Sequence, residues 1–140
     1  MDSNIHKIEN LHIEPPRKDI LARLKYNVHK TKLNGKSLEL FEKTLGFATS
    51  LCECRGIYRF LDITNKSDKM TVLSDGTVFE SADLAKLLKD SSKAVMMAST
   101  AGAEITEEVN ILLGKNRTSE AVIVDATASE MADEAMNKIN

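Results

Sequence analysis

The chain has 140 residues, enough for one domain with a hydrophobic core that needs no cross-links. Its 19 basic and 21 acidic residues give a net charge of −2 without a basic stripe, and aromatic residues make up only 4%, which argues against a nucleic-acid binder. No apolar run approaches the roughly 20 residues that span a bilayer, and the polar N-terminus lacks the form of a secretory signal. We therefore expect a cytoplasmic protein with no membrane or nucleic-acid partner.

The N-terminal part of the chain predicts a polar lead-in followed by a short helix. Residues 1–16 are polar and end in two prolines, so we expect a loose segment that stops before a helix. Pro16 suits the position just ahead of a helix over 17–25. That helix has one apolar side, formed by Ile20, Leu21 and Leu24. We therefore expect a single domain over 17–140.

A longer helix is predicted over 36–54, with Ser37 as its N-cap. Apolar residues recur there at three- and four-residue steps, along one stripe formed by Leu38, Phe41, Leu45, Ala48 and Cys52. The period then changes to two over 57–63. This change indicates a strand that carries Ile57, Leu61 and Ile63 on one side.

A hairpin, a short helix and a buried strand are expected next. Asp75-Gly76 supplies the positive-φ residues of a tight turn, so 70–79 predicts a hairpin. Ser81 is the expected N-cap of a helix that ends near residue 89 and buries three leucines, Leu84, Leu87 and Leu88. The continuous apolar run over 93–100 is typical of a buried strand.

Two further helices complete the predicted elements. The first covers 104–113 and is closed by Gly114 in the left-handed conformation. Thr118 or Ser119 caps the second, which ends near residue 138 and has an apolar stripe formed by Val124, Ala128, Met131, Ala135 and Met136. Helices interleave with strands, but the hairpin requires antiparallel pairing. The pattern therefore favours an α+β fold, with helices packed on a mainly antiparallel sheet.

The residues by themselves name no reaction. The three histidines show no metal-ligand spacing and no pairing with a nucleophile. Cys52 and Cys54 form a lone Cys-x-Cys, which is typical of reduced cytosolic thiols. The turn at 100–103 is either a close-packed strand-to-helix turn or a set of backbone N–H groups that holds an anion; one glycine favours the first reading. We therefore predict no catalytic residue and no metal site.

The segment from Ser81 onward contains a strand that leads into Thr-Ala-Gly-Ala-Glu at 100–104 and a helix that opens with Ala-Val-Ile-Val-Asp-Ala at 121–126. This order resembles the activation domain of vitamin B12-dependent methionine synthase and its small stand-alone relatives, from about residue 17 to residue 140. The resemblance implies a domain that binds S-adenosylmethionine and presents its methyl group to an oxidised corrinoid. One electron from a flavoprotein or ferredoxin then permits reductive methylation.

For individual residues, the resemblance places the acidic residue that contacts S-adenosylmethionine at Asp133, with Glu134 beside it. From charge patterning alone, both are typical of a solvated helix face. The family's Arg…Gly-Tyr segment, which follows the last helix, has no counterpart here, so we expect a domain truncated at its C-terminus.

Two functions are expected on this basis. One is an accessory module that supports the reactivation of a corrinoid methyltransferase, with cobalamin held by the partner protein. The other is a non-catalytic protein that docks on a corrinoid protein and has lost S-adenosylmethionine binding. Apolar surface left open by the missing segment is expected to favour a homodimer.

Overall fold

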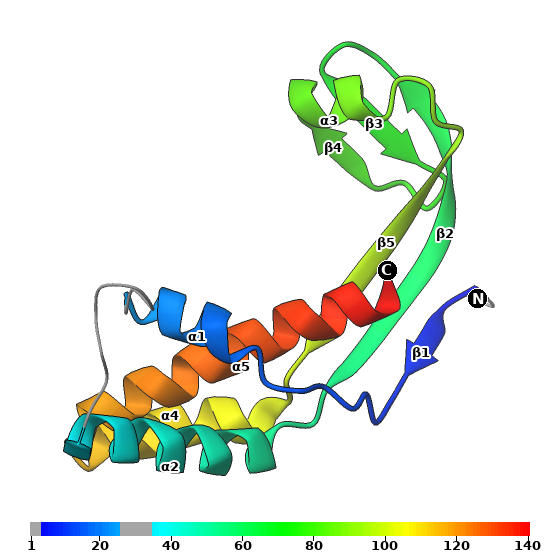
Figure 1. The fold of residues 1–140 in the computed structure, drawn as a ribbon. Helices are drawn as coiled ribbons and strands as arrows, with labels where there is room; N and C mark the ends of the chain where they lie inside the picture. Colours follow the sequence, from blue (N-terminus) through cyan, green and yellow to red (C-terminus); the bar gives the residue numbers. More distant parts are fainter. Residues whose placement is uncertain (1–3, 26–34) are drawn as a thin grey trace. The chain divides into compact units, whose positions relative to one another are not determined.

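The computed structural model describes residues 4–25 and 35–140 (Figure 1). Its contacts divide the chain into two compact units. The first unit comprises Met1–Lys7 and Ile57–Ala98, and the second comprises Ile8–Gly56 and Ser99–Asn140. The expected single domain over 17–140 stays a prediction.

The order of elements is mixed, and the predicted α+β class is confirmed (Figure 1). The strands are β1 (His6–Ile8), β2 (Arg55–Lys66), β3 (Met70–Leu73), β4 (Val78–Glu80) and β5 (Lys93–Thr100). The helices are α1 (Arg17–Arg23), α2 (Gly35–Leu51), α3 (Ala82–Leu87), α4 (Ala103–Gly114) and α5 (Thr118–Ile139).

The five strands form one sheet, in the order β1-β2-β3-β4, with β5 paired to β2. Strands β2 and β3 are antiparallel, with Ile63 opposite Leu73, and the register shifts just after this pair. Strands β3 and β4 are also antiparallel. Strand β2 is longer than the predicted 57–63, and it buries Leu61 but exposes Ile57.

The predicted hairpin between β3 and β4 is confirmed. Gly76 has φ 90°, which suits a residue without a side chain, and its N–H donates to the Leu73 carbonyl at 3.0 Å. Asp75 accepts from the Thr77 N–H at 2.9 Å and pairs with Arg59. The hydrogen bonds from Thr77, followed by the charge of Arg59, lower the pKa of the Asp75 carboxyl. The hydrogen bond from Thr77 and the ion pair with Arg59 therefore both stabilise the turn at Asp75.

Helix α3 has the predicted cap but not the predicted burial. The Ser81 hydroxyl accepts from the Leu84 N–H at 3.2 Å, as expected of an N-cap. Ala85 is the buried residue, however, whereas Leu87 is 77% exposed. A helix of six residues has fewer than two turns, so only one narrow side of α3 packs against β3. Strand β5, at an edge of the sheet, likewise buries none of its eight residues, so the buried strand predicted for 93–100 is wrong.

The expectation of a loose lead-in over 1–16 is wrong for its described part. Residues 6–8 form β1, and the Leu11 N–H donates to the Cys54 carbonyl at 3.0 Å. Ile13 is buried in the core of the second unit. The apolar residues of this segment are scattered among polar ones, so its local sequence shows no pattern of a strand. Long-range pairing with other segments orders it instead.

Helix α5 is the centre of the second unit, where it contacts α4, α2 and α1. One core cluster joins α5 to α4 through Val124, Met131, Ile105 and Leu112. Another joins it to α1 and α2 through Ile123, Ala126, Ile20, Phe41 and Leu45. The predicted single stripe described only the first of these faces. The alanines of α5 keep it thin, so neighbouring helices can approach it closely.

Three helix ends differ from their predicted caps. Helix α4 ends at Gly114, but the left-handed residue that closes it is Asn116 (φ 58°): the Arg117 N–H donates to the Leu112 carbonyl, and the Asn116 N–H donates to the Leu113 carbonyl. These two bonds form a Schellman motif. Arg117 is the N-cap of α5 without a side-chain bond to the helix backbone, so neither Thr118 nor Ser119 caps it. Helix α2 begins at Gly35, which places Ser37 inside its first turn.

Candidate functional site

The two acidic residues predicted to bind a ligand lie on the last two turns of α5, in different surroundings. Consecutive helix residues point about 100° apart, so Asp133 and Glu134 do not face the same way. Glu134 is half-buried and accepts from the Asn137 amide at 3.2 Å. The Asp133 side chain is 68% exposed, and its Oδ2 lies 3.6 Å from a guanidinium nitrogen of Arg23.

Arg23, in the last turn of α1, is the cation at the centre of this site. Its Nε donates to Glu130 Oε1 at 2.8 Å, and the Glu130 side chain is only 15% exposed. This hydrogen bond, with smaller effects from nearby carboxylates, raises the pKa of Arg23 further above its ordinary value. The guanidinium therefore stays charged and is shared between Glu130 and Asp133.

Arg23 was not predicted from the sequence. Arg23 lies 107 positions before Glu130. No local feature of the sequence distinguishes it from the other basic residues of α1. Only the packing of α1 on α5 brings the two together. The resulting Arg23 site is composed of Arg23, Glu130 and Asp133. It carries one net negative charge, and its most accessible acceptor is Asp133, so it can bind a small cationic group.

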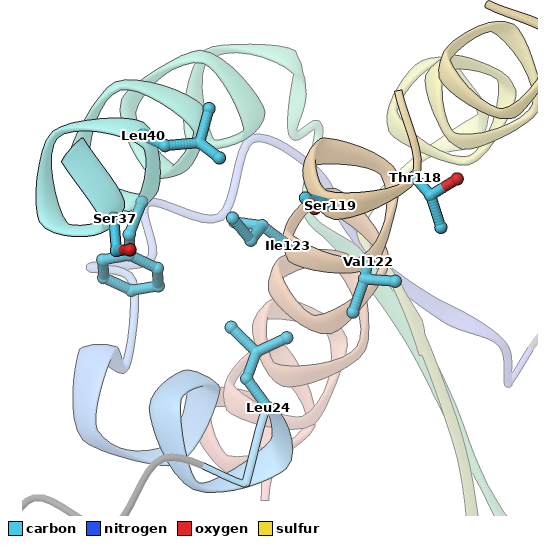
Figure 2. Close-up of a pocket in the computed structure, with 8 residues that line it drawn as sticks. Leu24, Ser37, Leu40, Thr118, Ser119, Val122 and Ile123 are labelled. Carbon is cyan, nitrogen blue, oxygen red and sulfur yellow. The ribbon is translucent and has the colours of Figure 1, made fainter. Parts of the chain in front are cut away.

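A hollow of about 350 Å³ lies at the other end of α5 (Figure 2). Leu24 at the end of α1, Leu40 on α2 and Ile123 on α5 converge on it (Figure 2). Its other lining residues are Ser37, Phe41, Thr118, Ser119 and Val122. None of these side chains is charged, and the volume is near the lower end of the range for small-ligand sites.

This hollow is separate from the predicted ligand residues. On α5, Asp133 follows Ile123 by ten residues, which corresponds to about 15 Å along the helix. A second hollow, of about 540 Å³, lies in the first unit and is lined by residues of both charges, including Lys66, Asp68, Asp83 and Lys86. Neither hollow contains Asp133 or Glu134.

The turn at 100–103 supports the close-packed reading. Gly102 has φ 97°, and a Cβ added to it would lie 3.2 Å from the Cβ of Glu53. Its N–H already donates to the Thr100 hydroxyl at 3.0 Å, and the Glu53 N–H donates to the Ala101 carbonyl at 2.8 Å. The backbone of this turn is therefore engaged by the protein itself.

Both cysteines are free thiols. Burial, with a smaller effect of Cys54, raises the pKa of Cys52 to about 11, and burial also raises the pKa of Cys54. Nucleophilic attack requires the thiolate, which is scarce at neutral pH in such surroundings. Cys52 instead donates to the Ala48 carbonyl at 3.4 Å.

Over 4–25 and 35–140, no group of three or more His, Cys, Asp or Glu side chains is placed to hold a metal ion. In the same ranges, each helix is too short or too polar to traverse a bilayer.

No protein-family model matches the sequence. No curated protein matches it either. The fold, in contrast, is similar to a solved structure, the crystal structure of the MetH reactivation domain bound to AdoHcy. The TM-score is 0.56 at 15% sequence identity, and the match covers 96% of this chain and 53% of the other. The chain thus spans about half the length of that structure and shares its fold.

Proposed function

We propose that this protein is a module of the corrinoid-reactivation type, which binds S-adenosylmethionine and serves a partner protein that holds cobalamin. The observation that carries the proposal is the fold similarity to the MetH reactivation domain over 96% of the chain. A second, independent support is the resemblance of residues 81–140 to the activation-domain pattern. The chemistry of methyl acceptance belongs to the cobalt of the partner's cofactor.

The Arg23 site fits one part of the proposed ligand. S-adenosylmethionine carries an α-ammonium group and a sulfonium, and the exposed carboxylate of Asp133 can accept a charged hydrogen bond from the ammonium. Arg23 competes for the same carboxylate from 3.6 Å. The ligand therefore has to displace or share this ion pair, which costs little because exposed pairs contribute about 0–1 kcal/mol.

A calorimetric titration with S-adenosylmethionine, repeated with S-adenosylhomocysteine, tests the proposal. Asp133→Asn is expected to weaken binding about tenfold or more, because a charged hydrogen bond contributes about 1.5–3 kcal/mol. The matched control is Asp125→Asn, another exposed carboxylate of α5. Arg23→Gln is expected to tighten binding, because it removes the competing cation.

The outcomes separate the ligand from its site. Binding that is insensitive to Asp133→Asn would reject Asp133 as a contact while leaving the ligand in place. An absence of heat from the wild type and from Arg23→Gln would reject S-adenosylmethionine as the ligand. Glu134→Gln distinguishes the two predicted residues, since Glu134 faces Asn137 and not Arg23.

A second candidate function is a docking protein of a corrinoid protein that binds no S-adenosylmethionine. The pairing of Asp133 with Arg23 favours it, as does the position of both described hollows away from Asp133. Its test is size-exclusion chromatography with a cobalamin-loaded corrinoid protein. A complex without ligand heat supports docking, and an absence of both contradicts both functions.

A further inference from the structure

The Arg23 site holds more negative than positive charge. The hydrogen bond from Arg23 to Glu130, together with the charge of Glu130, raises the pKa of the guanidinium. The charges of Asp133 and Asp125 raise it further. Three carboxylates on α5 therefore act on one guanidinium, so a positive charge brought to this part of α5 meets a net attraction.

The charge of Arg23 is directed mainly to Glu130. Its Nε donates to Glu130 at 2.8 Å, and that side chain is only 15% exposed. The distance of 3.6 Å between Arg23 and Asp133 is longer than a hydrogen bond between nitrogen and oxygen. Glu130 is thus neutralised by a fixed partner, whereas Asp133, at 68% exposure, keeps most of its charge. Asp133 is therefore the negative charge that a ligand meets.

S-adenosylmethionine and S-adenosylhomocysteine differ by one methyl group and one charge. The methylated sulfur is a sulfonium, and the demethylated sulfur is a neutral thioether. In both ligands the sulfur lies about 5 Å from the α-ammonium nitrogen. An ammonium bound to Asp133 therefore places the sulfur about 6–8 Å from the carboxylate. Two unit charges at that distance attract by about the thermal energy in water, and by several times more where water is partly excluded.

We propose that the Arg23 site discriminates between these two ligands by charge and binds S-adenosylmethionine about three- to tenfold more tightly than S-adenosylhomocysteine. The inference rests on the proposed function and on Asp133 as the contact of the ammonium. The lower end of the range corresponds to full screening by water, and the upper end to a ligand that covers the carboxylate. The demethylated ligand is thus the weaker binder, and fresh S-adenosylmethionine displaces it.

Competitive calorimetry with three ligands tests charge separately from shape. The third ligand is sinefungin, in which a carbon that bears an amine replaces the methylated sulfur, so the positive charge is kept without a sulfonium. Sinefungin and S-adenosylmethionine are expected to bind with similar affinity, and both more tightly than S-adenosylhomocysteine. An increase of the ionic strength from about 0.05 M to about 0.5 M is expected to reduce the preference to about twofold or less, because salt screens exposed charges.

Three substitutions change the charge near the ligand in known directions. Asp133→Asn is expected to bring the ratio of the two dissociation constants close to one. Arg23→Gln is expected to raise the ratio, because it removes a positive charge from the site. Asp133→Glu keeps the charge, so it is expected to keep the ratio even where its affinity for both ligands falls.

The outcomes separate this inference from the proposed function. Equal affinities for S-adenosylmethionine and S-adenosylhomocysteine at low salt overturn the inference and leave the proposed function in place. Sinefungin that binds as weakly as S-adenosylhomocysteine also overturns it, because the preference then follows the methyl group and not the charge. Where Asp133→Asn binds too weakly to measure, a ratio that does not rise in Arg23→Gln overturns it. An absence of heat from all three ligands, with the wild type and with Arg23→Gln, overturns both.

Discussion

Replacement of Gly102 by alanine tests the close-packed turn that leads into α4. Gly102 has φ 97° and ψ 164°, a region that is essentially restricted to glycine and costs other residues about 1–3 kcal/mol. The added Cβ would also lie 3.2 Å from Glu53 Cβ and 3.3 Å from its carbonyl oxygen. Backbone atoms yield less than a flexible side chain, which adds about 1 kcal/mol or more. We expect Gly102→Ala to lower the free energy of unfolding by about 2–4 kcal/mol.

Gly46→Ala is the matched control, because it makes the same change in the same unit with the opposite expected sign. Gly46 lies inside α2, and a Cβ added there meets nothing within 4 Å. Alanine in a helix interior is favoured over glycine by about 1 kcal/mol, so this variant should be more stable. Urea unfolding followed by circular dichroism measures both, through the shift in midpoint at constant slope. If Gly102→Ala unfolds within about 0.5 kcal/mol of the wild type, the reasoning is refuted.

Three further predictions concern buried and capping groups. Thr71 and Thr127 are both fully buried, but the Thr71 hydroxyl lacks a partner whereas Thr127 donates to the Ile123 carbonyl at 2.8 Å. Urea unfolding should show Thr71→Val more stable by about 1 kcal/mol and Thr127→Val neutral or less stable; the same gain in both would contradict this. Cys52, with a pKa of about 11 when folded, ionises first in the unfolded chain, near pH 9. The free energy of unfolding should therefore fall between about pH 9 and pH 11, and this fall should be shallower in Cys52→Ala. Alkylation of Cys52 should stay slow below that range. A free energy of unfolding that rises with pH there would contradict the burial of this thiol. Asn116→Gly should raise the melting temperature, corresponding to about 0.5–1 kcal/mol, because glycine adopts the left-handed cap without strain; a decrease would mean that the Asn116 side chain stabilises the turn.

The candidate site shows where sequence reasoning succeeds and where it ends. The sequence pattern placed Asp133 on the polar side of a long C-terminal helix, and α5 is that helix. It did not identify Arg23, because no local pattern links a residue of α1 to one 107 positions later. The hollow around Ile123 was not predicted either, since its lining residues come from three separate segments.

The sequence by itself determined the features that depend on neighbours within about four residues. Helix periodicity, the Asp75-Gly76 turn and the Ser81 cap follow from local backbone preferences and hydrogen bonds, and the structure confirms them. The alternation of helices with an antiparallel hairpin was likewise sufficient for the fold class. The tertiary structure alone decided that residues 6–8 form the strand β1 and that β5 lies at an edge of the sheet. It also decided that α5 is buried on two faces and that Asp133 pairs with Arg23. These features depend on which distant segments cover each residue, and the local sequence does not specify those segments.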